Sequence, residues 1–290
     1  MTTTAAPAAK PLRGLFSKVY HGILTDKAQL PSMPHVALRI RAAMQQKNFT
    51  AEKAARVIEA DAGTSAYLIA VANSALYRGR VPITNVQNSV SRFGMEITRN
   101  LVMSYALRAM FTTRSPVLAR LLQNTWRDGA RLAALSSIMA KRCSGFVPDQ
   151  AMLGGLLQDI GILPLLKALD HSKQSITDPN RVLATVESYA NKVGPVLLEH
   201  WGFDESIVEV ARSRKDWLRD PAPTADLADL ILVARLHAGV GTAEQNTQPH
   251  INQVPAFNKL PLGDVGPGES LLILQEAETD VQDVMKMLGV

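Results

Sequence analysis

A single polar pair, Gln158-Asp159, interrupts the apolar run LGGLLQDIG at residues 153–161. Burying a carboxylate in such a run costs free energy unless a cation or hydrogen-bond donors accompany it. A carboxylate in this setting can bind a metal ion that activates water for hydrolysis, provided that histidines or other carboxylates complete the ligand set. The glutamine beside Asp159 therefore bears directly on whether such a site works, because an amide is a poor ligand for hydrolytic metals.

The elements that would position this pair are predicted to be helices. Hydrophobic residues make up 47% of the 290 residues and aromatic residues only 5%, and Ala and Leu predominate. This composition suits packed helices better than β-sandwiches or barrels. We find no sustained apolar/polar alternation between turn residues, which is the pattern expected of half-buried strands. The fold class predicted is all-α.

Two helical lobes in series are predicted, joined near residues 112–116. Five helices with short connections fill about 30–112, and the fourth of them is expected to stop at Gly94, a residue suited to the end of a helix. A second block opens at Ser115-Pro116, where a capping residue precedes a first-turn proline. Its predicted helices cover 116–141, a segment from Pro148 through Gln158-Asp159, about 180–201, a segment from Asp204, and 224–240.

Three segments lie outside these lobes. Residues 1–21 contain Ala, Thr and Pro with little pattern and are predicted to be a flexible arm. Residues 241–268 are rich in Gly, Pro, Asn and Gln, which indicates a linker or a loop that wraps the surface. Residues 269–290 are predicted to form an acidic amphipathic helix that docks on the basic body or on a partner, with apolar residues at helical spacing: Leu274, Val281, Met285 and Leu288.

Several segments together resemble a known bacterial signalling module. LPSMPHVALRI (30–40), AVANSALY (70–77) and ITNVQNSVSRFG (83–94) resemble the first lobe of an HDOD domain. The second lobe resembles that family's degenerate relative of the HD phosphohydrolase fold, through TWRDGARLAALSSIMAK, GGLLQDIGIL, VGPVLLEHWGFDESI and LILVARLHA. The resemblance covers about 22–240. It implies a five-helix HDOD lobe at about 22–112 followed by an HD-like helical bundle at about 115–240.

The resemblance also implies which residues stand where the metal ligands of an HD phosphohydrolase would be. Asp128 takes the place of the first histidine, Gln158-Asp159 that of the His-Asp pair, and Arg235 that of the later aspartate. Of these four ligand positions only Asp159 keeps its type, so we expect neither metal, cofactor nor catalysis. We further hypothesise that Asp128 and Asp159 face Arg235 across the old pocket, so that a guanidinium replaces the metal's charge. The alternative is that these groups lie partly in solvent and cap helices.

A second candidate site is a basic rim that could bind phosphates and stack a base, since basic residues interleaved with an aromatic do both. The opposing interpretation is a solvated helix end, where cations are favourable to the helix dipole. The residues of this rim are Arg78, Arg80, Arg212, Arg214, Lys215 and Trp217.

The resemblance implies a non-catalytic scaffold or adaptor in bacterial signal transduction, whose partners are receiver, kinase or cyclic-dinucleotide signalling proteins. Two alternatives stay open: residual metal-dependent phosphohydrolase activity, and binding of nucleic acid or a cyclic dinucleotide through the basic rim. The formal net charge of +5 permits an acidic partner without requiring one. One cysteine, Cys143, no secretory leader and no apolar run of about 18 residues lead us to expect a cytoplasmic protein without a membrane span.

Overall fold

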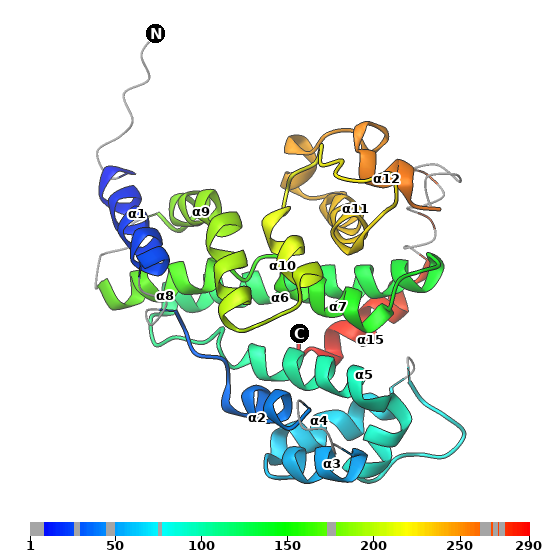
Figure 1. The fold of residues 1–290 in the computed structure, drawn as a ribbon. Coiled ribbons are helices and arrows are strands. Elements are labelled where there is room, and N and C mark those ends of the chain that lie inside the picture. Colours follow the sequence, from blue (N-terminus) through cyan, green and yellow to red (C-terminus); the bar gives the residue numbers. More distant parts are fainter. Residues whose placement is uncertain are drawn as a thin grey trace.

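The computed structural model describes residues 9–25, 30–44, 50–74, 77–172, 178–261, 268, 272 and 276–290. Within these ranges the chain forms helices, turns and irregular connections, with no strand. The all-α prediction is therefore confirmed. Figure 1 shows the helices of the first lobe on one side of the molecule and those of the second lobe on the other.

The first lobe contains four helices, of which the last is kinked into two. These are α2 (His35–Met44), α3 (Ala51–Glu59), α4 (Ala62–Ala72) and α5 (Val86–Arg108). Gly94 lies inside α5 with φ of +75°, a backbone conformation that favours glycine. The predicted stop at Gly94 is thus a kink between two helical segments, and the lobe holds the five segments expected. Asp61 caps α4, because its side chain accepts a 2.7 Å hydrogen bond from the Thr64 backbone N–H.

The second lobe is built on a pair of adjacent helices, α6 (Pro116–Arg142) and α7 (Pro148–Leu157). Around them lie α8 (Ile162–Ser172), α9 (Pro179–His200), α10 (Glu205–Arg212) and α11 (Leu227–Gly239). The prediction missed α8 as a separate helix. Its apolar residues continue those of α7, and the turn between them carries no proline to mark a break.

The predicted flexible arm is wrong from residue 9 onward, since α1 (Ala9–Thr25) is a helix that packs on α8 and α9. Phe16 and Ile23 are fully buried, and Leu15 and Val19 pack against the same core. These residues share one face of a helix, and burial of that face offsets the entropy of ordering the segment. Residues 1–8 of the predicted arm lie outside the described residues.

The segment that follows α11 is more ordered than a linker. It forms two 3₁₀ turns (Ala243–Thr247 and Ile251–Gln253) and α12 (Pro255–Lys259), and both α12 and the first turn contact α11. Phe257 is buried there because it fills the gap beside α11. Of the two alternatives, residues 241–261 therefore fit the surface-wrapping segment, whereas 262–267 lie outside the described residues.

The terminal helix α15 (Glu278–Met287) packs on the long helix α6 and also contacts α4. Val281 and Val284 are buried, and the Trp126 indole Nε1 donates a 3.1 Å hydrogen bond to the Leu288 carbonyl. The helix thus docks on the body, which was one of the two expected positions. This helix begins at Glu278, and Leu274 lies outside the described residues.

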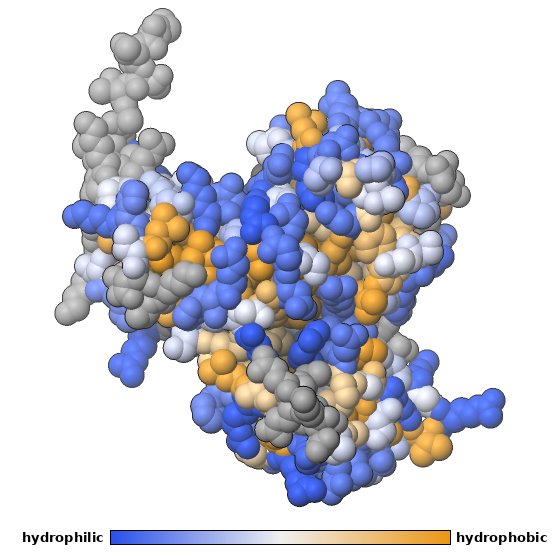
Figure 2. All heavy atoms as spheres, viewed as in Figure 1, coloured by the Kyte–Doolittle hydropathy of each residue, from blue (hydrophilic) through white to orange (hydrophobic). Residues whose placement is uncertain are grey.

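Side-chain hydrogen bonds, among them those of Tyr77 and Trp201, join the lobes beside the packing of α5 on α7. The Tyr77 hydroxyl donates to the carboxylate of Asp149 in the first turn of α7. The Trp201 indole Nε1 donates to the Pro31 carbonyl at 2.9 Å. On the face drawn in Figure 2, hydrophilic residues cover much of the surface, with apolar patches between them.

One stretch, Pro148–Ser172, is long and apolar enough to cross a membrane by length and composition alone. It comprises α7, α8 and the turn between them. Most of it is buried inside the helical fold, as expected of core helices. Its apolar character is therefore explained by the core that it forms.

Gly161, between α7 and α8, lies against the backbone of α9. An added Cβ would overlap the Ala190 carbonyl oxygen and lie 2.7 Å from the Gly194 backbone nitrogen. We predict that Gly161→Ala destabilises the fold by at least about 3 kcal/mol, because backbone atoms cannot yield as a side chain would. Gly14→Ala is the control, since nothing lies within 4 Å of its added Cβ. Urea unfolding measures both, and equal stabilities would contradict the tight crossing.

Candidate functional site

Gln158 and Asp159, at the end of α7, point to a guanidinium on α11. Nη1 of Arg235 donates to the Gln158 Oε1 at 2.7 Å and to the Asp159 Oδ2 at 2.9 Å. The Arg235 side chain is 8% exposed and that of Asp159 is 13% exposed. A charged hydrogen bond in such a dry place is strong and geometrically specific. Arg235 therefore provides a cation for the carboxylate that the sequence buries.

A second guanidinium completes the surroundings of Asp159. Nε of Arg214, in the turn after α10, donates to the Asp159 Oδ1 at 2.5 Å, and Nη2 contacts the same oxygen. The Arg214 side chain is only 3% exposed. Each carboxylate oxygen of Asp159 thus contacts a different arginine, Oδ1 that of Arg214 and Oδ2 that of Arg235.

Further carboxylates balance the surplus positive charge. Glu187 on α9 lies 2.7 Å from Nζ of Lys215 and 3.6 Å from Nη2 of Arg214. Glu244, in the first 3₁₀ turn, lies 3.1 Å from the same lysine and 3.8 Å from Nη2 of Arg235. We call these six residues the buried ion network. Its three cations match its three carboxylates: Arg214, Lys215 and Arg235 against Asp159, Glu187 and Glu244.

The network keeps Asp159 ionised. Burial by itself raises the pKa of the Asp159 carboxyl, but the charges of Arg214 and Arg235 outweigh it and hold that pKa well below its usual range. The Asp159 carboxyl group is therefore deprotonated in the folded protein. Arg235 stays protonated for the same reason, since Asp159 and Glu244 raise its pKa against the opposing effect of burial.

Asp128 does not join the network. Its side chain on α6 is 75% exposed, and its nearest ion pair is with the neighbouring Arg127, at 3.9 Å. The hypothesis that both aspartates face Arg235 is thus corrected: Asp159 does so and Asp128 does not. The pKa of the Asp128 carboxyl is nevertheless raised. The main cause is desolvation by the surrounding protein, and the negative charge of the nearby Asp159 adds to it. Three of the four aligned positions are in direct contact, and the fourth lies at the edge.

The residues of the predicted basic rim are divided between four environments. Arg214 and Lys215 belong to the buried ion network. Arg212 is held by three carboxylates, at 2.6 Å from Glu205, 2.7 Å from Glu209 and 3.3 Å from Glu199. Arg78 and Arg80 are exposed in a turn of the other lobe, and the half-buried Trp217 packs against the core. Most of this charge is therefore neutralised within the protein.

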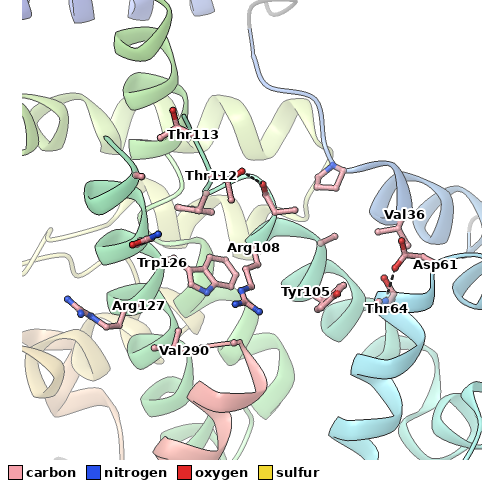
Figure 3. Close-up of a pocket in the computed structure, with 18 of the residues that line it drawn as sticks. Val36, Asp61, Thr64, Tyr105, Arg108, Thr112, Thr113, Trp126, Arg127 and Val290 are labelled. Atoms are coloured by element: carbon pink, nitrogen blue, oxygen red, sulfur yellow. Dashed lines mark hydrogen bonds between the residues drawn. The ribbon is translucent and has the colours of Figure 1, made fainter. Parts of the chain in front are cut away.

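A groove that the sequence did not predict lies between the lobes. This interlobe groove has a volume of about 830 Å³. In Figure 3, Asp61 and Thr64 form one wall, Trp126 and Arg127 the opposite wall, and Arg108 and Val290 lie between them. Both polar and apolar side chains line it. No local motif could have predicted this groove, because each wall comes from a different helix.

The comparisons with known proteins place this architecture. An HDOD domain matches residues 30–217, about two thirds of the chain. The chain belongs to the HDOD domain family. The match includes the whole first lobe and the second lobe as far as Trp217. No protein with a curated description matches it.

Solved structures share the fold over nearly the whole chain. A proposed metal-dependent phosphohydrolase from Shewanella amazonensis SB2B is 25% identical, with a TM-score of 0.76 over 96% of this chain and 98% of its own. An HDOD domain protein of unknown function from Geobacter sulfurreducens is 18% identical, with a TM-score of 0.65 over 93% and 96%. A proposed signal transduction protein from Marinobacter aquaeolei VT8 is 18% identical, with a TM-score of 0.66 over 97% of this chain and 66% of its own.

The side chains at the aligned position do not fit a divalent metal. Such ions need neutral imidazoles and carboxylates with an open position for water. Two guanidinium groups contact the one carboxylate instead, and they repel a cation. Within the ranges that the structure describes, no group of three or more His, Cys, Asp or Glu residues could hold a metal. We therefore derive no chemical step through a metal in this protein.

The network makes a direct prediction for stability. Arg235→Met should lower the free energy of unfolding by about 3–5 kcal/mol, because it leaves the buried Asp159 with one cation fewer and Gln158 without its donor. Arg127→Met on α6 is the matched control. Its side chain is 58% exposed and its ion pair is long, so a loss of less than about 1 kcal/mol is expected. Urea unfolding near neutral pH compares the two, and similar losses would contradict the network's role.

Proposed function

We propose that this protein is a non-catalytic module of bacterial signal transduction that works as a protein-interaction scaffold or adaptor. The observation that carries the proposal is the pairing of Asp159 with Arg214 and Arg235. A hydrolytic HD site would use this carboxylate to hold a metal. Here the carboxylate is already bound on both oxygens, and the charge that the metal would supply comes from the chain itself.

The family membership and the interlobe groove support the interaction role. The fold is shared with a proposed signal transduction protein, and this likeness supports a signalling role. The groove offers what a protein partner needs, namely exposed cations and amides beside apolar surface. Arg127 and Gln123 stand exposed on its α6 wall, while Trp126 packs beneath them. We propose receiver, kinase or cyclic-dinucleotide signalling proteins as the partners.

Two other functions are less well supported. Residual phosphohydrolase activity is favoured by the description of the Shewanella structure, but the donor set of this chain opposes it. Binding of nucleic acid or a cyclic dinucleotide through the basic rim needs free cations, whereas Arg212, Arg214 and Lys215 are occupied by carboxylates.

Metal content and turnover test the absence of catalysis. We expect the purified protein, after loading with Mn²⁺ or Mg²⁺ and desalting, to retain no stoichiometric metal and to hydrolyse neither p-nitrophenyl phosphate nor its bis ester. The reason is that two fixed guanidinium charges occupy the position of the ion. The triple variant Asp128→His, Gln158→His, Arg235→Asp restores the ligand types and serves as the comparison for metal uptake. Stoichiometric metal with turnover in the natural sequence would overturn the proposal.

Binding through the groove is tested by charge reversal on α6. Arg127→Glu should weaken capture of a signalling partner at least about tenfold, because it places a like charge against the acidic surface expected of that partner. Arg120→Glu makes the same charge change on an exposed part of the same helix that does not line the groove. Quantitative affinity capture compares the two variants, and an equal effect of both would argue against the groove.

A further inference from the structure

A second, smaller cavity lies between the lobes and shares helices α2 and α5 with the interlobe groove. Its volume is about 250 Å³. The first lobe contributes Arg41 from α2 and Arg99 and Asn100 from α5. The second lobe contributes Gln150 from α7 and the turn between α9 and α10, which includes Phe203. We call this cavity the arginine pocket.

Arg41 reaches the pocket because Gly202 makes room for it. An added Cβ at Gly202 would overlap the guanidinium of Arg41. The backbone there has φ of +67°, a conformation that glycine adopts without strain. Among the residues that the structure describes, Arg41 makes no side-chain hydrogen bond or ion pair. Its guanidinium thus lies half-buried at the lobe boundary with unused donors.

Arg99 provides a second cation with unused capacity. Its ion pair with Glu96 is long, at 3.9 Å, and that glutamate side chain is 80% exposed. Its Nε donates to the Asn100 Oδ1 at 3.4 Å, which is also long for a hydrogen bond. A guanidinium carries five N–H donors in a planar fork that matches carboxylate or phosphate oxygens. Most donors of Arg99 therefore remain available.

The balance of charge in the pocket is positive. Two arginines face one carboxylate, that of Asp204, whose side chain makes no capping hydrogen bond to α10. Beside the amides of Asn100 and Gln150, the rest of the lining is largely apolar or aromatic, and it includes Met33, Met103, Trp201 and Phe203. Cations beside such a wall are poorly solvated, so an anion of matching size would be bound more strongly there than at the open surface.

We propose that the arginine pocket binds a small organic anion, whose phosphate or carboxylate group contacts Arg41 and Arg99 and whose ring or apolar part packs on Phe203. The volume lies below the roughly 300–1,000 Å³ of sites for drug-sized ligands, so a dinucleotide is too large. This site does not depend on the proposed scaffold function and uses neither the interlobe groove nor the buried ion network. Because both lobes contact the anion, its binding also stabilises their relative placement.

The three tryptophans allow a site-resolved test. Trp201 lines the arginine pocket, Trp126 lines the interlobe groove, and Trp217 follows the Arg214-Lys215 turn. We would titrate the ¹⁵N-labelled full chain with phenyl phosphate, benzoate and inorganic phosphate, following the three indole N–H signals. Trp126→Phe and Trp217→Phe assign them. We expect the Trp201 signal to move saturably with a ring-bearing anion, while the other two stay in place. The stronger of phenyl phosphate and benzoate identifies the anionic group.

Arginine variants connect the response to the pocket. Arg41→Gln and Arg99→Gln should each weaken binding at least about tenfold, the usual effect of losing a charged hydrogen bond. Arg39→Gln is the control, because it removes the same charge from an exposed position of α2. The two test arginines lie on different helices, so either variant suffices if the other fails to fold.

Three results would overturn the proposal. One is that neither phenyl phosphate nor benzoate moves the Trp201 signal. Another is that all three indole signals move together, as expected of non-specific binding to a basic protein. The last is that Arg39→Gln weakens binding as much as the two pocket variants do. None of these outcomes would bear on metal content or on capture through the groove, so the two proposals can fail independently.

Discussion

The pairing of Asp159 with two guanidinium groups is the interaction on which the second lobe depends. A lone carboxylate at this depth would take up a proton or destabilise the fold. Arg235 from α11 and Arg214 from the turn after α10 prevent both outcomes. Through Glu187 and Glu244 the same network extends to α9 and to the segment after α11. Charge balance thus joins elements that are far apart in the sequence.

The same arrangement shows how the chain itself can hold these helices together around a buried carboxylate. Arginine supplies a fixed positive charge with directed hydrogen bonds, so the helices are joined through Asp159. The lobes, by contrast, meet through few polar contacts, chiefly Tyr77 with Asp149 and Trp201 with Pro31. Residues of both lobes line the groove and the arginine pocket, so binding there can act on both lobes.

Local patterns predicted most helices well and failed where packing decided the outcome. The Gly94 kink and the proline-led starts of α6 and α7 follow from backbone chemistry that neighbours cannot easily override. The prediction of a flexible arm was wrong for α1, because the apolar face of this helix is stabilised only by its packing on α8 and α9. Charge identity predicted that Arg235 would meet Asp159, but it could not show that Asp128 points toward solvent or that Arg214 completes the pair.

The sequence by itself determined the all-α class and the family, since each depends on residue types at short spacings. Only the tertiary structure decided which cations are paired with carboxylates in the network and which keep unused hydrogen-bond donors. Arg212, Arg214 and Lys215 form a basic run in the sequence and are neutralised, whereas Arg41 and Arg99 belong to no such run and face a cavity. The physical reason is that a charge is free or paired according to neighbours that lie up to 76 positions away along the chain.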